Sequence, residues 1–309
     1  MDSRLTVSVS PHIRSSITTK KIMLDVVIAL LPAVIAGVII FGLSALWILL
    51  TCVATCVLSE YIFNLIIKKD QTIGDFSAVV TGILLGLNIP ANTPLWQAVV
   101  GSVFAIIVVK CIFGGIGCNV VNPAITARVF MLIAFSNLNK AAFPVFADAV
   151  SSATPLPQIA DGNSQSILNL FLGNIGGAIG ETCKLALLIG GIYLICRRVI
   201  TWHIPVSFIG TVFVLSLLLN GFDFYTAVCL TLSGGLFIGA FFMATDYVTS
   251  PSTKSGKIIF GLGCGLITVL IRFCRTYPEG VSFAILIMNI LNPYIESLTR
   301  RKLFGGKRK

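Results

Sequence analysis

Charged residues are scarce in this sequence. They make up 11% of its 309 residues, whereas a soluble domain carries roughly 25%. Hydrophobic residues account for 56%, so too few charges remain to cover a globular surface of this size. The scarcity excludes an ordinary soluble fold and indicates that lipid contacts most of the surface.

Histidine is nearly absent, and the cysteines lack the spacing of a metal site. The two histidines, His12 and His203, have no partners at metal-ligand spacing, and the nine cysteines include no Cys-x-x-Cys pair. Most cysteines lie in apolar runs, where a thiol behaves as a small hydrophobe. Cys111 and Cys118 can supply part of an iron–sulfur site shared with another chain, with buried packing as the alternative. We predict no metal site built by this chain alone.

The basic residues are placed beside apolar runs. The net charge of +10 invites a nucleic-acid interpretation, but the lysines and arginines cluster at 20–21, 68–69, 197–198 and 300–309. Such clusters set the orientation of membrane spans. We therefore predict the lipid bilayer, and no nucleic acid, as the partner of these charges.

Apolar segments of about 20 residues are long enough to cross a hydrocarbon core of about 30 Å. The sequence predicts an all-α polytopic membrane protein with about ten transmembrane helices. The third segment is short and ends in Asn88-Ile89-Pro90, which indicates a broken or re-entrant span. The predicted spans are 22–42, 45–67, 76–89, 95–113, 119–136, 179–199, 204–220, 224–243, 256–273 and 281–298.

Placement of lysine and arginine predicts that both termini are cytoplasmic. The outer segments then contain only Lys140 among basic residues, with Arg272 and Arg275 as the exception. The predicted divisions are a cytoplasmic segment 1–21, a five-helix half 22–136, an extracytoplasmic loop 137–178, a second five-helix half 179–298 and a basic cytoplasmic tail 299–309.

The two halves share short resemblances. Because five spans is an odd number, the second half enters the membrane in the opposite orientation, and we predict a 5+5 inverted repeat. Such repeats place functional sites near the bilayer midplane, on broken helices. The matching segments are Asp75-Phe76 with Asp223-Phe224, Thr81-Gly82 and Gly86 with Ser233-Gly234-Gly235 and Gly239, and Asn122-Pro123 with Asn292-Pro293.

The outer loop contains a hydroxyl-rich segment that ends at Pro155. Proline biases Thr154 toward an extended backbone, and the small Ser152 and Ala153 leave its hydroxyl accessible. An accessible hydroxyl outside the membrane suits covalent modification, and an ordinary turn is the alternative.

The segment resembles the recognition pattern of the flavin transferase that esterifies FMN onto threonine. The pattern is Asp-x-x-Ser/Thr-Gly/Ser-Ala-Thr, and Asp148, Ser151, Ser152, Ala153 and Thr154 fit it in register. With further motifs, nearly the whole chain resembles the RnfD/NqrB family, most closely RnfD. These motifs are Gly173-Asn174-Ile175-Gly176-Gly177, Gly180-Glu181-Thr182, Phe242-Met243-Ala244-Thr245-Asp246, Thr249-Ser250-Pro251, Gly256-Lys257, Ile271-Arg272, Tyr277-Pro278-Glu279-Gly280 and Phe283-Ala284-Ile285-Leu286.

The resemblance implies a subunit of an Rnf complex, an ion-translocating ferredoxin:NAD oxidoreductase that moves Na⁺ or H⁺ and is not catalytic through this chain alone. Thr154 would carry FMN through a phosphoester, made outside the cytoplasm by the flavin transferase. The implied partners are the other Rnf membrane subunits, including a flavinylated subunit that faces outward. Family members can also hold riboflavin between helices.

Four polar residues in or near the spans are candidate cofactor-binding groups. Glu181 and Lys184 stand three apart, close enough on a helix to pair, and they follow a glycine-rich approach suited to anions. Arg128 lies inside the fifth span, where a charge needs a partner. Asp246 lies in an oxygen-rich group. A structural ion pair and a helix cap are the respective alternatives for Glu181–Lys184 and Asp246.

The competing functional hypothesis is a secondary transporter or channel for a small solute, because a 5+5 inverted repeat is typical of transporters. A transporter has no need of the Asp148–Thr154 segment. A purely structural scaffold is disfavoured by Arg128 and Asp246.

Overall fold

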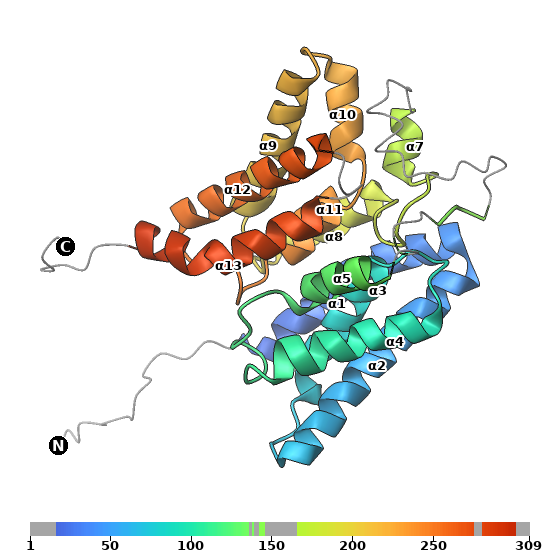
Figure 1. Cartoon of the computed structure of the whole chain (residues 1–309), viewed down its shortest axis with the longest axis vertical. Helices are drawn as coiled ribbons and strands as arrows, with labels where there is room; N and C mark the ends of the chain where they lie inside the picture. Colours follow the sequence, from blue (N-terminus) through green and yellow to red (C-terminus); the bar gives the residue numbers. More distant parts are fainter. Residues whose placement is uncertain (1–16, 136–137, 139–141, 146–165, 275–279, 301–309) are drawn as a thin grey trace, which may run out of the picture.

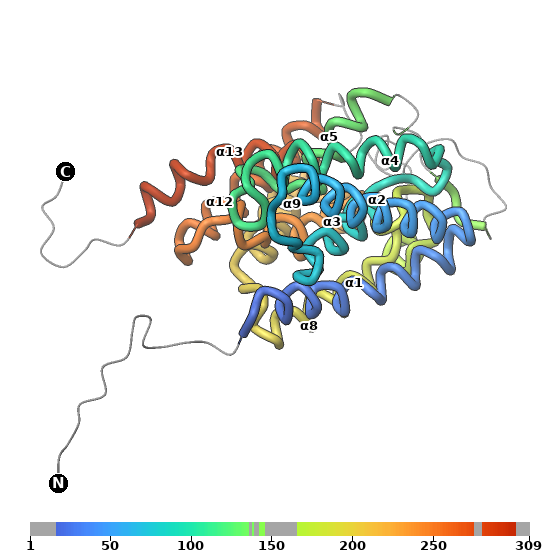
Figure 2. Tube along the Cα trace, turned by 90° about the horizontal axis from the view of Figure 1, so that it is seen from below, coloured from blue at the N-terminus to red at the C-terminus, as the bar shows by residue number. Residues whose placement is uncertain are grey.

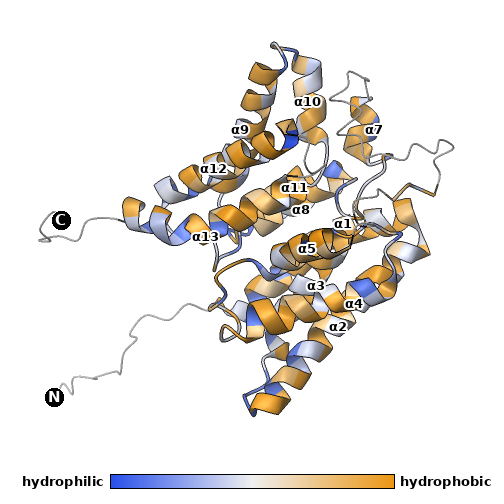
Figure 3. Cartoon of the chain, in the orientation of Figure 1, coloured by the Kyte–Doolittle hydropathy of each residue, from blue (hydrophilic) through white to orange (hydrophobic). Residues whose placement is uncertain are grey.

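The inward and outward faces of the helices have opposite character. Helix α1 (Thr19–Phe41) exposes Leu24, Ile28, Leu31, Ile35 and Ile39, spaced three or four residues apart on one face. Buried charged groups lie inside the bundle instead, among them Glu60, Lys110 and Arg128. This pattern reverses that of a water-soluble protein, and Figure 3 shows hydrophobic residues along the helices. The arrangement is that of a protein whose solvent is lipid.

The computed structural model describes residues 17–135, 138, 142–145, 166–274 and 280–300. Within these ranges all regular structure is helical, and the only pairing of extended backbone is an isolated bridge between Ala142 and Gly177. The predicted all-α class is therefore confirmed for the part of the chain that is described.

The first half contains five apolar helical segments. After α1 come α2 (Leu43–Ile67), the short η1 (Ile73–Asp75) and α3 (Ser77–Leu87). Helix α4 (Leu95–Val103) continues into the π-helix η2 (Phe104–Cys111), and α5 (Pro123–Ala134) follows. Helix α5 begins where the Asn122 side chain accepts the backbone N–H groups of Ala124 and Ile125, with Pro123 at the first helical position.

The second half follows a short helix α7 (Ile167–Leu172). Its helices are α8 (Lys184–Cys196), α9 (His203–Leu219), α10 (Phe224–Leu232), α11 (Leu236–Ile238), η4 (Gly239–Met243), α12 (Lys254–Phe273) and α13 (Val281–Thr299). In Figure 1 helices α2 to α5 occupy one side of the molecule and α9 to α13 the other. Contacts between α1 and α8 and between α5 and α13 join the halves.

Among the described residues, four helices are long and apolar enough to cross a membrane: α1, α2, α12 and α13. Helix α10 and the α11–η4 segment make a fifth if their 65° bend lies within one span. Helix α3 has 11 residues, a length of roughly 16 Å at 1.5 Å per residue. The third segment is thus a half-length helix, in agreement with the broken or re-entrant span expected there.

Both described ends lie at the same end of the bundle. Figures 1 and 2 show the start of α1 and the end of α13 on one side of the molecule. At this end Arg197, after α8, contacts both carboxylate oxygens of Asp25 in α1 at 3.2 Å. We refer to it as the basic end.

Candidate functional site

A buried ion pair joins the two halves. Arg128 of α5 lies 2.6 Å from the Glu181 carboxylate, and the two side chains are only 7% and 4% exposed. Arg128 also donates a hydrogen bond to the side-chain oxygen of Asn88, which caps the C-terminal end of α3. The sequence predicted that Arg128 has a partner inside the bundle, and the structure shows that this partner is Glu181 from the opposite half.

Glu181 reaches this position because the glycine-rich segment before α8 packs closely on the end of α3. The backbone N–H of Gly180 donates to the carbonyl of Leu87 at 2.6 Å, and that of Ile179 to the carbonyl of Ile89 at 3.2 Å. A Cβ atom at Gly180 would lie 2.6 Å from the Cβ of Leu87. Only glycine permits this approach.

Lys184 is fully buried and donates a hydrogen bond to the backbone carbonyl of Glu181. The two residues are neighbours, but α8 begins at Lys184 and leaves Glu181 outside the helix, so they do not pair from one helix as their spacing predicted. The Glu181 carboxylate contacts Arg128. Arg128, Glu181 and Lys184 form one cluster, which we call the interface cluster.

The end of the short helix α3 and the break between α10 and α11 meet at the interface cluster. A Cβ at Gly235, in the break between α10 and α11, would lie 3.0 Å from a Glu181 carboxylate oxygen. The C-terminal end of α3 faces Arg128 through Asn88. Helix C-termini favour cations and N-termini favour anions. The C-terminal end of α3 faces the Arg128 guanidinium, and the N-terminal end of α11 faces the Glu181 carboxylate.

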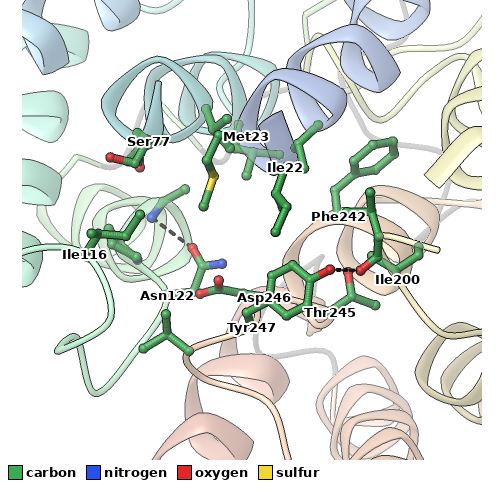
Figure 4. Close-up of a pocket in the computed structure, with 18 of the residues that line it drawn as sticks. Ile22, Met23, Ser77, Ile116, Asn122, Ile200, Phe242, Thr245, Asp246 and Tyr247 are labelled. Atoms are coloured by element: carbon green, nitrogen blue, oxygen red, sulfur yellow. Dashed lines mark hydrogen bonds between the residues drawn. The ribbon is translucent and has the colours of Figure 1, made fainter. Parts of the chain in front are cut away.

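A cavity separates the two halves toward the basic end. Its volume is about 100 Å³. Apolar side chains from α1 and η4, including Ile22, Met23 and Phe242, form much of its wall. In Figure 4 these side chains and those of Asn122 and Asp246 surround a common space.

Asp246 lies in the segment connecting η4 to α12 and is partly buried in the cavity wall. Desolvation raises the pKa of its carboxyl, while a hydrogen bond from the Thr249 hydroxyl, at 3.2 Å, acts in the opposite direction. Across the same wall the Asn122 side chain donates to the carbonyl of Met243 at 3.3 Å. Thr245 and Asp246 of the predicted oxygen-rich group thus line this cavity, and Thr249 supports Asp246.

The charged side chains that sequence reasoning missed are Glu60 and Lys110. Lys110 lies inside the predicted span 95–113 and is 3% exposed. Its ammonium lies 2.9 Å from Glu60 of α2 and donates to the Ser77 hydroxyl at 2.6 Å. The available signal was the position of Lys110 inside an apolar run, where an ionised group needs a partner.

We expect Lys110→Met to lower the stability of the folded chain strongly. Removing the ammonium leaves the Glu60 carboxylate buried without its ion-pair partner, which typically costs about 3–5 kcal/mol. Thermal unfolding in detergent measures the loss. Lys69→Met is the matched control, because Lys69 is exposed and donates to the Gly114 carbonyl at 2.7 Å. Equal melting temperatures for the two variants would contradict the expectation.

Asp148, Ser151, Ser152, Ala153 and Thr154 lie outside the described residues. The chain before them is held at the end of α1, where the backbone N–H of Val145 donates to the carbonyl of Ile40 at 2.9 Å. This is the end of α1 opposite Asp25 and Arg197.

Within the described ranges no group of three or more His, Cys, Asp or Glu side chains is arranged to hold a metal ion. Cys111 is buried and Cys118 exposed.

Fold and site together define a helical membrane protein whose halves meet through buried charges and broken helices. The chain belongs to the NQR2, RnfD, RnfE family, whose model matches residues 6–305.

Three similar proteins match this chain over nearly its full length and nearly their own. The chain is 47% identical to the D subunit of the Na⁺-translocating ferredoxin:NAD⁺ oxidoreductase complex of Acetobacterium woodii, over 97% of this chain and 95% of that protein. It is 40% identical to the D subunit of the proton-translocating ferredoxin:NAD⁺ oxidoreductase complex of Clostridium ljungdahlii, over 98% and 97%. Identity to the D subunit of the ion-translocating oxidoreductase complex of Stutzerimonas stutzeri is 38%, over 95% and 93%. The family resemblance seen in the sequence is confirmed.

Proposed function

We propose that this chain is the RnfD subunit of an Rnf-type membrane complex and carries FMN covalently on Thr154. The complex couples electron transfer from ferredoxin to NAD with movement of Na⁺ or H⁺. The observation that carries the proposal is the Asp148–Thr154 segment, in a chain similar to Rnf subunits over its whole length. The test is flavin fluorescence of the denatured chain on a gel, after co-expression with the flavin transferase.

The flavin supplies the redox chemistry and the protein binds, orients and tunes it. A phosphoester at Thr154 tethers FMN through its phosphate and leaves the ring free. The partners in this proposal are the other Rnf membrane subunits, among them the outward-facing flavinylated subunit, and the transferase for maturation.

The proposed topology is ten spans in a 5+5 inverted repeat, with both termini in the cytoplasm of a prokaryote. Helix packing supports this topology. In the first half α2 packs against α3 and α4, and in the second half α9 packs against α10 and α12, so the second helix of each half has the same role. Contacts also join α1 to α8 and α5 to α13, and these are the equivalent helices in the proposed repeat. The shared location of the described ends is also consistent with an even number of spans.

Within this topology the interface cluster holds the base of the outer loop. Glu181 and Lys184 follow the segment 173–180, which returns from the loop to the end of α3. We place Arg128, Glu181 and Lys184 as the groups that fix and electrostatically tune the flavin-bearing loop. Glycine-rich backbone before a helix suits the FMN phosphate.

Riboflavin is proposed to occupy the cavity beside Asp246. A flavin needs an apolar slot with a few polar groups, and the cavity supplies Ile22, Met23 and Phe242 against Asn122 and Asp246. Its volume of about 100 Å³ is smaller than a typical small-molecule site, so the proposal requires the cavity to widen when riboflavin binds. Riboflavin released by denaturing the purified protein, measured separately from protein-bound FMN, tests this site.

Asp246→Asn is expected to be more stable than the wild type at pH 7. Because the pKa of the folded carboxyl is raised above the ordinary value of 3.8, folding favours its protonated form. The stabilising effect of the Asp246 carboxyl is fully present below the ordinary pKa of 3.8 and is lost as the pH rises through the raised pKa of the folded state. The gap between variant and wild type should therefore shrink toward pH 4, as measured by melting temperature.

Asp223→Asn is the control of opposite sign. Its pKa is lowered, chiefly by a hydrogen bond from the Thr226 side chain, so the wild-type carboxylate stabilises the fold at neutral pH and loses that effect in acid. A pH-independent effect of Asp246→Asn would contradict the environment described for Asp246.

A transporter or channel is the second candidate function. The observation that favours it is the meeting of two broken spans at buried charges between the halves, which is the usual place of a transport site. A correctly matured chain without bound flavin would favour this alternative.

A further inference from the structure

A groove between α9, α10 and α12 lies at the end of the bundle opposite the basic end. Helices α9 and α12 begin close together, where Lys257 donates to the Thr201 hydroxyl at 3.2 Å. The groove lies near their other ends and has a volume of about 420 Å³. Its lining includes the polar Ser216, Asn220 and Arg272 and the apolar Leu219, Val269 and Phe273.

Arg272 is fixed at the groove wall by the end of α10. Its guanidinium donates to the backbone carbonyls of Leu230 at 2.9 Å and Ser233 at 3.1 Å. These carbonyls belong to the last turn of α10 and its C-cap, where a cation is favourable. The guanidinium thus stays in one place beside the groove. In the sequence Arg272 is an exception, because the outer side is otherwise nearly devoid of basic residues.

The apolar wall of the groove continues onto the lipid-facing surface. Leu219 is 52% exposed and Phe273 is 67% exposed. One site therefore offers a cation and an amide at its polar part and a hydrocarbon surface running out of it. A free phosphate would leave the apolar wall uncovered, whereas an amphiphile with an anionic head matches both parts.

We infer that this groove binds an anionic phospholipid. The phosphate lies against Arg272 and Asn220, because a guanidinium pairs well with phosphate oxygens. One acyl chain lies along Leu219, Val269 and Phe273. The chemistry of the lipid follows from the groove itself. We place the lipid in the outer leaflet, and this placement alone rests on the proposed topology.

The test compares lipids on the purified complex. Phosphatidylglycerol added in detergent is expected to raise the melting temperature of this chain by about 2–4 °C, and phosphatidylcholine to raise it much less. Leu219→Trp fills the groove without touching Arg272 and should lose most of the response. Leu218→Trp is the matched control, because Leu218 is equally exposed, at 53%, but lies outside the groove; it should respond as the wild type does. Native mass spectrometry should show one phosphatidylglycerol fewer on the Leu219→Trp complex.

Three results would overturn the inference. The first is an equal response of Leu219→Trp and Leu218→Trp. The second is equal stabilisation by phosphatidylcholine. The third is equal stabilisation by inorganic phosphate, which would make the groove a site for a free anion. Arg272→Gln should lower the melting temperature without lipid and also remove the response to phosphatidylglycerol.

Discussion

Thr154→Val is expected to remove covalently bound flavin from the chain completely. Valine has nearly the shape of threonine but lacks the hydroxyl oxygen that forms the phosphoester, so no bond to FMN can be made at this position. After co-expression with the flavin transferase, the wild-type band should fluoresce on a denaturing gel under ultraviolet light, and the variant band should be dark.

Two variants in the same segment separate recognition from attachment. Ser152→Gly stays within the pattern, which accepts Gly or Ser there, and should keep its fluorescence. Asp148→Ala departs from the pattern and should lose it while retaining the Thr154 hydroxyl. Fluorescence of the Thr154→Val band at the wild-type level would show that the flavin is attached elsewhere.

Arg128→Gln should cause the largest loss of stability that a single substitution produces in the interface cluster. The Glu181 carboxylate would remain buried beside Gly235 without the guanidinium that lies 2.6 Å from it. Breaking a buried pair in this way typically costs about 3–5 kcal/mol. Thermal unfolding of the purified protein measures the effect.

The control is an arginine–carboxylate pair whose guanidinium is exposed. The Arg197 side chain is 57% exposed, while Asp25, 3.2 Å away, is 12% exposed and keeps the hydrogen bond from the Tyr193 hydroxyl. Arg197→Gln should therefore lower the melting temperature much less than Arg128→Gln does. The double variant Arg128→Met with Glu181→Met removes both charges and should be more stable than Arg128→Gln. A melting temperature for Arg128→Gln equal to that for Arg197→Gln would show that the pair does not hold the halves together.

The sequence predicted the lipid-facing character of the fold because composition and span length are local properties. It also predicted that Arg128 needs a partner inside the bundle, and that the third segment is shorter than a full span. The partner of Arg128 was beyond reach, because Glu181 arrives through a backbone contact between Gly180 and Leu87, residues far apart in the chain. Hydrophobic pattern contains no information on such tertiary contacts.

Lys110 illustrates why charge placement is an ambiguous signal. A lysine near the end of an apolar run is usually a determinant of orientation, but Lys110 is enclosed by Glu60 and Ser77. The distinguishing fact is a carboxylate on a neighbouring helix at the same depth, and this depends on how α2 packs against η2. By contrast, Asp246 was correctly placed in an oxygen-rich group, because Thr245 and Thr249 are its neighbours in the sequence.

Peptide mapping of the wild-type chain by mass spectrometry, after co-expression with the flavin transferase, tests the central claim most directly. The account predicts that the peptide containing Thr154 carries the mass of FMN less one water, with fragment ions that place it on Thr154. An unmodified Thr154 peptide, in a preparation whose transferase is active on another substrate, would contradict the account.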